Sequence, residues 1–150
     1  MRLLLDTNVL IFLSKDPSFE LLEKIVNPEG QRIFISVVSI AELNSLSIQY
    51  GWGTKRWQVL NSIIDQAVII EVNQNLINIY AELDAFSQRR NPSYSQYHFN
   101  TPRNMGKNDL WLASTAALLG LKLVTTDADF GHLHKVFIEV QYLKPELFKL

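Results

Sequence analysis

The chain has 150 residues, of which 47% are hydrophobic and 19% charged, with 14 Lys and Arg against 15 Asp and Glu. These values predict one soluble globular domain over residues 1–150, long enough to form a core without disulfides or structural zinc. No cysteine is present, which excludes thiol catalysis and cysteine-ligated metals. Because the net charge is only −1, any binding of nucleic acid has to come from a local basic patch.

The N-terminal apolar run is too short to direct the chain into a membrane. It reaches Asp6 after three leucines, whereas a membrane span needs about 18 apolar residues and a signal peptide needs a longer apolar core. We therefore expect a cytoplasmic protein with no membrane contact.

Short β-like runs alternate with longer helical patterns, which is typical of parallel strands joined by crossover helices. Apolar runs of strand length predict strands over residues 2–5, 33–36, 67–70, 122–125 and, at an edge of the sheet, 137–140. Apolar residues at helical spacing predict helices over residues 7–13, 19–26, 37–46, 57–64, 74–90 and 108–119. Residues 91–106 contain two prolines and few aliphatic residues, which predicts a long loop of a kind that is often functional. The expected fold class is α/β.

Acidic residues occur where predicted strands end or where the following helices begin. They are Asp6 after the first strand, Glu42 after the second, Asp109 before the fourth, and Asp127 and Asp129 after the fourth. Since ligands bind outside the carboxyl ends of parallel strands, we expect these side chains at one edge of the sheet. Each also has an ordinary structural explanation: Asp109 as a helix N-terminal charge, Asp127 as a turn former and Glu42 as a solvated helix residue.

Taken together, the acids indicate a metal site. Asp6 and Glu42 lie inside apolar runs, where a solvated carboxylate is not expected. Clustered carboxylates repel unless something neutralises them, and oxygen ligands without His or Cys favour Mg²⁺ or Mn²⁺ over zinc. Such ions promote phosphodiester hydrolysis, so the pattern indicates a metal-dependent nuclease or phosphatase.

Four segments carry a family resemblance. They are Leu-Leu-Asp6-Thr7-Asn8-Val-Leu, Ser39-Ile-Ala-Glu42-Leu, Asn108-Asp109-Leu-Trp-Leu-Ala-Ser-Thr-Ala and Leu-Val-Thr125-Thr-Asp127-Ala-Asp129-Phe130. In this order they resemble the motifs of PIN-domain ribonucleases, and most of all the VapC-type toxins of prokaryotic toxin–antitoxin pairs. The resemblance implies a PIN-like three-layer sandwich around a mostly parallel sheet of about five strands. It also implies Mg²⁺ or Mn²⁺ as cofactor, RNA as substrate, a homodimer, and inhibition by a cognate antitoxin protein.

The resemblance assigns roles to individual residues. Asp6, Glu42, Asp109 and Asp127 match the catalytic and metal-binding acids, while Thr7, Asn8 and Thr125 match supporting polar positions. Asp129 is an alternative for the fourth acid. Asp127 is preferred because it lies nearer the end of the strand.

The loop region supplies a candidate surface for RNA. Residues 86–108 contain Arg89, Arg90, Arg103 and Lys107 and no acid, with Tyr94, Tyr97, His98 and Phe99 interleaved. Basic groups for phosphates and aromatic rings for stacking are how proteins hold single-stranded RNA. The alternative is a solvated loop whose rings pack on the body of the protein or on a second subunit. This loop is longer than in a compact toxin, which leaves the substrate preference open.

Other candidate residues have simpler structural explanations. Lys55, Arg56 and Trp57 form a weaker basic spot, which we interpret as a solvated helix start. Among the histidines, His98, His132 and His134, the last two are spaced for a shared ligand, but no third ligand is evident and no catalytic histidine is expected. Trp52 and Trp57 are interpreted as packing or dimer residues.

The function predicted is that of a Mg²⁺-dependent endoribonuclease toxin. An RNA-processing or 5′-flap-type nuclease of the same fold remains an alternative, as does a non-catalytic module that binds RNA or protein. A receiver-like signalling domain also gathers acids at strand ends. It would require a lysine after a late strand and an early acidic pair, and neither is evident.

Overall fold

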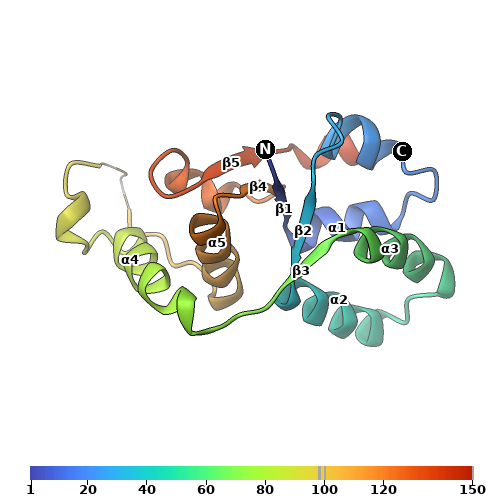
Figure 1. The fold of residues 1–150 in the computed structure, drawn as a ribbon, viewed down its shortest axis with the longest axis horizontal. Helices are drawn as coiled ribbons and strands as arrows, with labels where there is room; N and C mark the ends of the chain where they lie inside the picture. Colours follow the sequence, from blue (N-terminus) through green and yellow to red (C-terminus); the bar gives the residue numbers. More distant parts are fainter. Residues whose placement is uncertain (98, 100, 150) are drawn as a thin grey trace.

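The computed structural model describes residues 1–97, 99 and 101–149, and its centre is a sheet of five strands. The strands are β1 (Leu3–Leu5), β2 (Ile33–Ser36), β3 (Val68–Ile70), β4 (Lys122–Thr125) and β5 (Glu139–Tyr142). They lie in the order β3-β2-β1-β4-β5, and each neighbouring pair is parallel (Figure 1). Strand order therefore reverses between β1 and β4, the place where open parallel sheets bind ligands.

Helices cover both faces of this sheet. They are α1 (Thr7–Ser14), α2 (Val37–Tyr50), α3 (Thr54–Gln66), α4 (Ile77–Ser87) and α5 (Lys107–Leu119). In Figure 1, α1, α2 and α3 lie on one side of the sheet, and α4 and α5 on the other. This confirms the predicted three-layer α/β sandwich.

Side chains alternate along β1 and divide the core into two clusters. Leu3 and Leu5 pack with residues of α1, α2 and α3, while Leu4 packs with residues of α4 and α5. All three leucines are at most 1% exposed. A strand buried on both faces needs this continuous apolar run, which explains why the first strand has no polar alternation.

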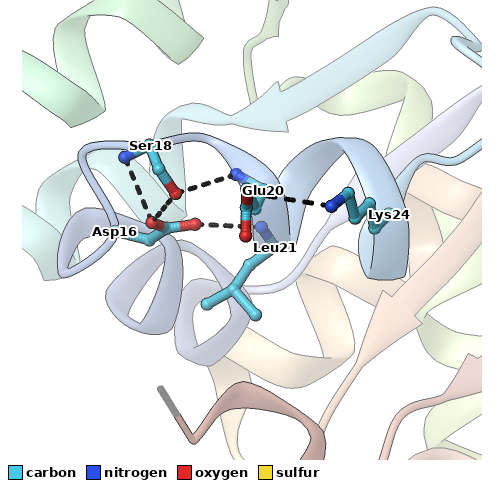
Figure 2. A network of polar contacts seen from close by, with 5 residues as sticks. All are labelled: Asp16, Ser18, Glu20, Leu21 and Lys24. Carbon is cyan, nitrogen blue, oxygen red and sulfur yellow. Dashed lines mark hydrogen bonds and ion pairs between the residues drawn. The ribbon is translucent and has the colours of Figure 1, made fainter.

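The segment after α1 differs from the predicted helix over residues 19–26. Its last turn, Leu22–Val26, is a π-helix, in which the N–H of Asn27 donates to the carbonyl of Leu22 at 2.8 Å. Buried Asp16 fixes its start: its carboxylate accepts from the N–H and hydroxyl of Ser18 and from the N–H of Leu21 (Figure 2). Burial tends to raise the pKa of Asp16, but these hydrogen bonds outweigh burial and lower it.

The predicted helix over residues 74–90 is shorter than expected. Residues Gln74–Leu76 form a 3₁₀ turn, and α4 ends at Ser87, followed by Arg89 in the left-handed region at φ 61°. The helix ends at Ser87 because the carbonyl of Ser87 accepts a hydrogen bond from the loop, from the N–H of Arg103 at 2.7 Å. Within the loop, Pro92–Tyr94 forms a short 3₁₀ turn.

The last strand was predicted two residues too early. β5 pairs Glu139 with Lys122, whereas Phe137 packs against Phe86 and Tyr94 instead of entering the sheet. A further 3₁₀ turn, Pro145–Phe148, has no counterpart in the sequence prediction, and it stacks Phe148 on Phe12 at 4.8 Å. No helix in the described part of the chain is both long and apolar enough to cross a membrane.

Candidate active site

Five carboxylates lie around the carboxyl ends of β1 and β4, and we call Asp6, Glu42, Asp109, Asp127 and Asp129 the acidic edge. Asp6 follows β1 and caps α1, and Asp127 caps the 3₁₀ turn Ala128–Leu133 that follows β4. Glu42 lies in the second turn of α2, and Asp109 in the first turn of α5. Separate segments thus bring their acids to the point where strand order reverses.

Asp6 is the most buried member, at 4% exposed. Its Oδ1 accepts from the N–H of Thr7 at 2.7 Å, and its Oδ2 accepts from the hydroxyl of Thr125 at 2.7 Å. The Thr125 hydroxyl also accepts from the N–H of Asp127 at 2.9 Å, so one side chain joins the ends of β1 and β4. Burial raises the pKa of Asp6, with further contributions from the charges of Asp127 and Glu42, although the two hydrogen bonds oppose this rise.

Thr7 connects Asp6 to Glu42. The backbone N–H of Thr7 donates to the carboxylate of Asp6. The Thr7 hydroxyl donates to Oε1 of Glu42 at 2.8 Å and lies 3.0 Å from the hydroxyl of Ser39. Ser39 is completely buried and was not singled out from the sequence. Its spacing three residues before Glu42 places both on one face of α2, and this is the signal that could have identified it.

Asp109 shows the electrostatic crowding most clearly. Burial, followed by the charges of Asp6, Asp127, Glu42 and Asp129, raises the pKa of Asp109 to about 6. The other four carboxylates of the acidic edge therefore all lie close enough to Asp109 to disfavour its ionised form.

Asp127 and Asp129 differ in their surroundings. One oxygen of Asp127 accepts from the N–H of Asp129 at 2.8 Å, and the residue is partly buried, while Asp129 is exposed. Asn8, the remaining polar residue of the first motif, is exposed on α1, and its side chain makes no hydrogen bond to a described residue.

Among the described residues, no cationic side chain forms an ion pair with the acidic edge. Between described residues the only ion pair joins Lys24 to Glu20 on the surface (Figure 2). Nor do any three His, Asp or Glu side chains of the described ranges converge closely enough to enclose one ion. The set instead fits Mg²⁺, a hard cation that keeps several waters and usually contacts one or two carboxylates directly.

The four basic residues of the loop region lie at the end of α4, in the loop and at the start of α5. Arg89 and Arg90 line a cavity at the end of α4, and Lys107 is the exposed first residue of α5. Arg103 is exposed, and its backbone ties the loop to Ser87.

The aromatic residues of the loop pack partly on the body of the protein. This agrees with the alternative prediction that the loop is solvated and its rings pack on the protein. The rings of Tyr94, Tyr97 and Phe99 lie 5.5, 6.2 and 5.3 Å from Phe86. His98 lies outside the described residues.

The two described histidines have structural partners. His132 lies 2.8 Å from the buried hydroxyl of Ser87, bonds the backbone of Asp129 and stacks on Phe86. Burial and the charge of Arg103 lower the pKa of His132 to about 4. His134 accepts from the N–H of Val140 at 2.9 Å. Neither ring is placed as a metal ligand, and no sequence signal pointed to Ser87.

The basic spot at the start of α3 differs from the predicted solvated helix start. Arg56 stacks over Trp52 at 3.6 Å, and its guanidinium donates to the hydroxyl of Ser14. Trp57 donates to Ser47 at 2.7 Å, and both tryptophans pack against the core. Aromatic faces attract guanidinium groups, which explains why Arg56 is withdrawn from solvent.

A family model described as PIN domain matches residues 3–136, a range that contains all four motifs and the acidic edge. The chain belongs to the PIN-domain family. Members of this family are generally nucleases. A comparison with curated proteins found no match.

Solved structures resemble this PIN domain over nearly its whole length. VapBC2 from Rickettsia felis, bound to a promoter DNA fragment, is 22% identical with a TM-score of 0.65, covering 93% of this chain and 98% of that one. VapBC-1 from nontypeable Haemophilus influenzae is 20% identical with a TM-score of 0.68, covering 95% and 98%. VapBC-5 from Mycobacterium tuberculosis, of the VapBC family of toxin-antitoxin systems, is 24% identical with a TM-score of 0.59, covering 95% and 98%. At these identities the likeness shows the shared fold.

Proposed function

We propose that this PIN domain is a Mg²⁺- or Mn²⁺-dependent endoribonuclease and the toxin of a VapBC-type toxin–antitoxin pair. The observation that carries the proposal is the acidic edge, whose carboxylates crowd one another without a cation from the described protein. A divalent ion would relieve this repulsion. When bound, it supplies a hydroxide nucleophile at neutral pH and polarises the phosphoryl group.

The chain's own residues would hold and orient this centre. Asp6, Glu42, Asp109 and Asp127 would hold the ion, one or two of them directly and the others through its water ligands, with Asp129 as a further or alternative ligand. Thr125 and Thr7 fix the carboxylates of Asp6 and Glu42 in one orientation through their hydroxyls. Such preorganisation matters because a ligand that is already placed loses little freedom on binding.

RNA would be held by the basic residues of the loop region. We propose that Arg89, Arg90, Arg103 and Lys107 contact phosphates, since residues 86–108 contain no acid and all four basic residues are exposed. Phosphate contacts position a nucleic acid without selecting its sequence.

Partners follow from the same proposal. Toxin–antitoxin complexes are among the structures that share the fold, so we propose a cognate antitoxin that places an Arg or Lys in the acidic edge and blocks it. We also propose a homodimer and a cytoplasmic location. Copurification with a short partner protein tests for the antitoxin, and the mass of the purified protein in solution tests for the homodimer.

The decisive experiment compares wild type with Asp109→Asn in an RNA cleavage assay. The amide keeps the shape of the side chain but not the charge that a divalent ion needs, so we expect loss of cleavage by a folded variant. EDTA should stop wild-type cleavage, and Mg²⁺ or Mn²⁺ should restore it. Asp65→Asn on α3, an exposed aspartate outside the acidic edge, is the matched control and should cleave normally.

Wild-type cleavage by folded Asp109→Asn would contradict the proposed site. Growth arrest on expression without the partner separates a toxin from an RNA-processing nuclease of the same fold. Metal-dependent cleavage with normal growth would favour the processing enzyme.

A further inference from the structure

A cavity of about 390 Å³ opens beside the C-terminal end of α4, where the long loop begins. Aromatic and basic side chains line it, among them Phe86, Arg90, Tyr94, Tyr97 and Phe99. Its volume falls in the range of about 300–1,000 Å³ that is typical of ligand pockets. None of the described residues that line it is acidic, in contrast to the acidic edge.

The ring of Tyr97 is available for stacking. It is 44% exposed, a large value for an aromatic side chain that also packs on the protein. Its neighbours meet it at an angle, Phe86 at 76° and Tyr94 at 42°, with centroids 6.2 and 6.0 Å away. Among described residues, no ring therefore lies flat on Tyr97, and a planar group could stack there.

Two guanidinium groups border these rings. Arg89 lies over Phe99 at 6.0 Å, and its backbone has φ 61°, in the left-handed region that non-glycine residues seldom adopt. The side chain of Arg90 makes no hydrogen bond or ion pair with a described residue. Strained backbone of this kind concentrates at functional sites, where surrounding structure maintains it.

The cavity is joined to the acidic edge through the partly buried side chain of His132. Phe86, which lines the cavity, stacks on His132 with the rings 6.0 Å apart and 6° from parallel. The adjoining Ser87 lies 2.8 Å from the same imidazole, and His132 bonds the backbone of Asp129. These contacts connect the wall of the cavity to the 3₁₀ turn that carries Asp129.

We propose that this cavity is a subsite for one unpaired nucleobase of the RNA, which stacks on Tyr97 while Arg90 contacts the adjoining phosphate. The inference rests on the proposed function and adds how the substrate is positioned. Combined aromatic faces and cations favour single-stranded nucleic acid, because each base has a π-face and each nucleotide a negative charge. A subsite of this kind would require an unpaired nucleotide at a set distance from the cleaved bond.

Binding in EDTA tests the subsite without cleavage. We would measure fluorescence anisotropy with two labelled strands of equal length, oligoadenylate and a fully abasic strand that keeps the phosphates. Tyr97→Ala should weaken binding of oligoadenylate by about 5- to 150-fold, the range for loss of one stacked base, and leave the abasic strand unchanged. Arg90→Gln should weaken both strands and reduce the slope of log affinity against log salt by about 0.7.

Matched variants keep the test interpretable. Tyr50→Ala removes a tyrosine that is 73% exposed on α2 and should bind both strands like wild type. Tyr97→Phe keeps the ring and should also bind like wild type. Tyr97→Leu keeps an apolar contact with Phe86 but no stacking face, so it should reproduce the loss seen with alanine.

Several results would overturn the subsite. The first is that Tyr97→Ala binds oligoadenylate as tightly as wild type does. The second is that Tyr97→Ala loses the same affinity for oligoadenylate and for the abasic strand. The third is that wild type binds the two strands equally tightly. If Tyr97→Ala changed only the mass of the oligomer or the capture of the antitoxin, the cavity would belong to a protein interface. A cleavage assay distinguishes failure of the subsite from failure of the proposed nuclease function. If wild type cuts RNA in the presence of metal and Tyr97→Ala binds oligoadenylate like wild type, only the subsite is refuted.

Discussion

Asp109→Asn removes one charge from the acidic edge with almost no change of shape, so it measures the cost of burying that charge beside the other carboxylates. Burial and the neighbouring acids raise the pKa of Asp109 from 3.8 to about 6. At about 1.36 kcal/mol per pKa unit, ionising this group in the folded protein costs about 3 kcal/mol. Because the side chain is only partly buried, screening by water should reduce the measurable cost to about 1.5–2 kcal/mol.

A smaller effect acts in the opposite direction. Asp109 lies in the first turn of α5, where a negative charge interacts favourably with the helix dipole by about 0.3–1 kcal/mol. We therefore expect Asp109→Asn to raise the free energy of unfolding by about 1 kcal/mol near pH 7.5 without divalent ions. For a chain of this length that corresponds to about 2–4 °C in Tm.

The pH dependence has a definite sign. A raised pKa in the folded state means that this protein binds the proton more tightly than the unfolded chain does, so the penalty is absent below pH 3.8. The penalty grows as pH rises and is complete above about pH 6. The advantage of Asp109→Asn should therefore shrink as pH falls from about 7 to 4.

Urea titrations in EDTA, followed by fluorescence of the three tryptophans, measure this effect. Asp65→Asn is again the control and should stay within about 0.5 kcal/mol of wild type. Equal or lower stability of Asp109→Asn near pH 7.5 would refute the crowding argument and leave Asp109 as a helix N-terminal charge. Asp6 suits this test less well, because an amide there could not accept both of its hydrogen bonds.

Three further predictions concern other contacts. Thr125→Val should lower the free energy of unfolding by about 1–3 kcal/mol in urea, since buried Asp6 and the N–H of Asp127 each lose a partner, whereas Thr125→Ser should remain near wild type. Asp16→Ala should cost about 0.5–2 kcal/mol, and Asp16→Asn less. Because the pKa of Asp16 is lowered, its contribution is present above pH 3.8 and is lost as pH falls through the lowered value, which titrations at low pH would reveal. Arg89→Ala with Arg90→Ala should reduce the salt slope of single-stranded RNA binding by about 1.4, and an unchanged slope would show that neither residue contacts phosphate.

The sheet and the place of the acids were predictable because both depend on local pattern and on one topological rule. Apolar runs located the first four strands, and the carboxyl ends of parallel strands must share an edge, which brings Asp6 and Asp127 together. The links through Thr7 and Thr125 depend on side-chain geometry across distant segments, and spacing alone does not reveal them.

The errors share one physical cause, which is tertiary contact overriding local preference. Gln88-Arg89-Arg90 favours helix, yet α4 ends earlier because the Ser87 carbonyl is taken by Arg103. The fifth strand begins later because Phe137, a good strand residue, finds its partners in the aromatic cluster around Phe86.

The Thr125–Asp6 bond also has a consequence for biosynthesis. Its two residues are 119 positions apart along the chain. At about 5–20 residues per second, the ribosome needs roughly 6–24 s to make the segment between them. During that time β1 has β2 beside it but lacks β4, the strand that brings Thr125 and the last two acids. A nascent or truncated chain that ends before Thr125 therefore lacks the assembled acidic edge, and the proposed cleavage could begin only after residues 125–129 have been made.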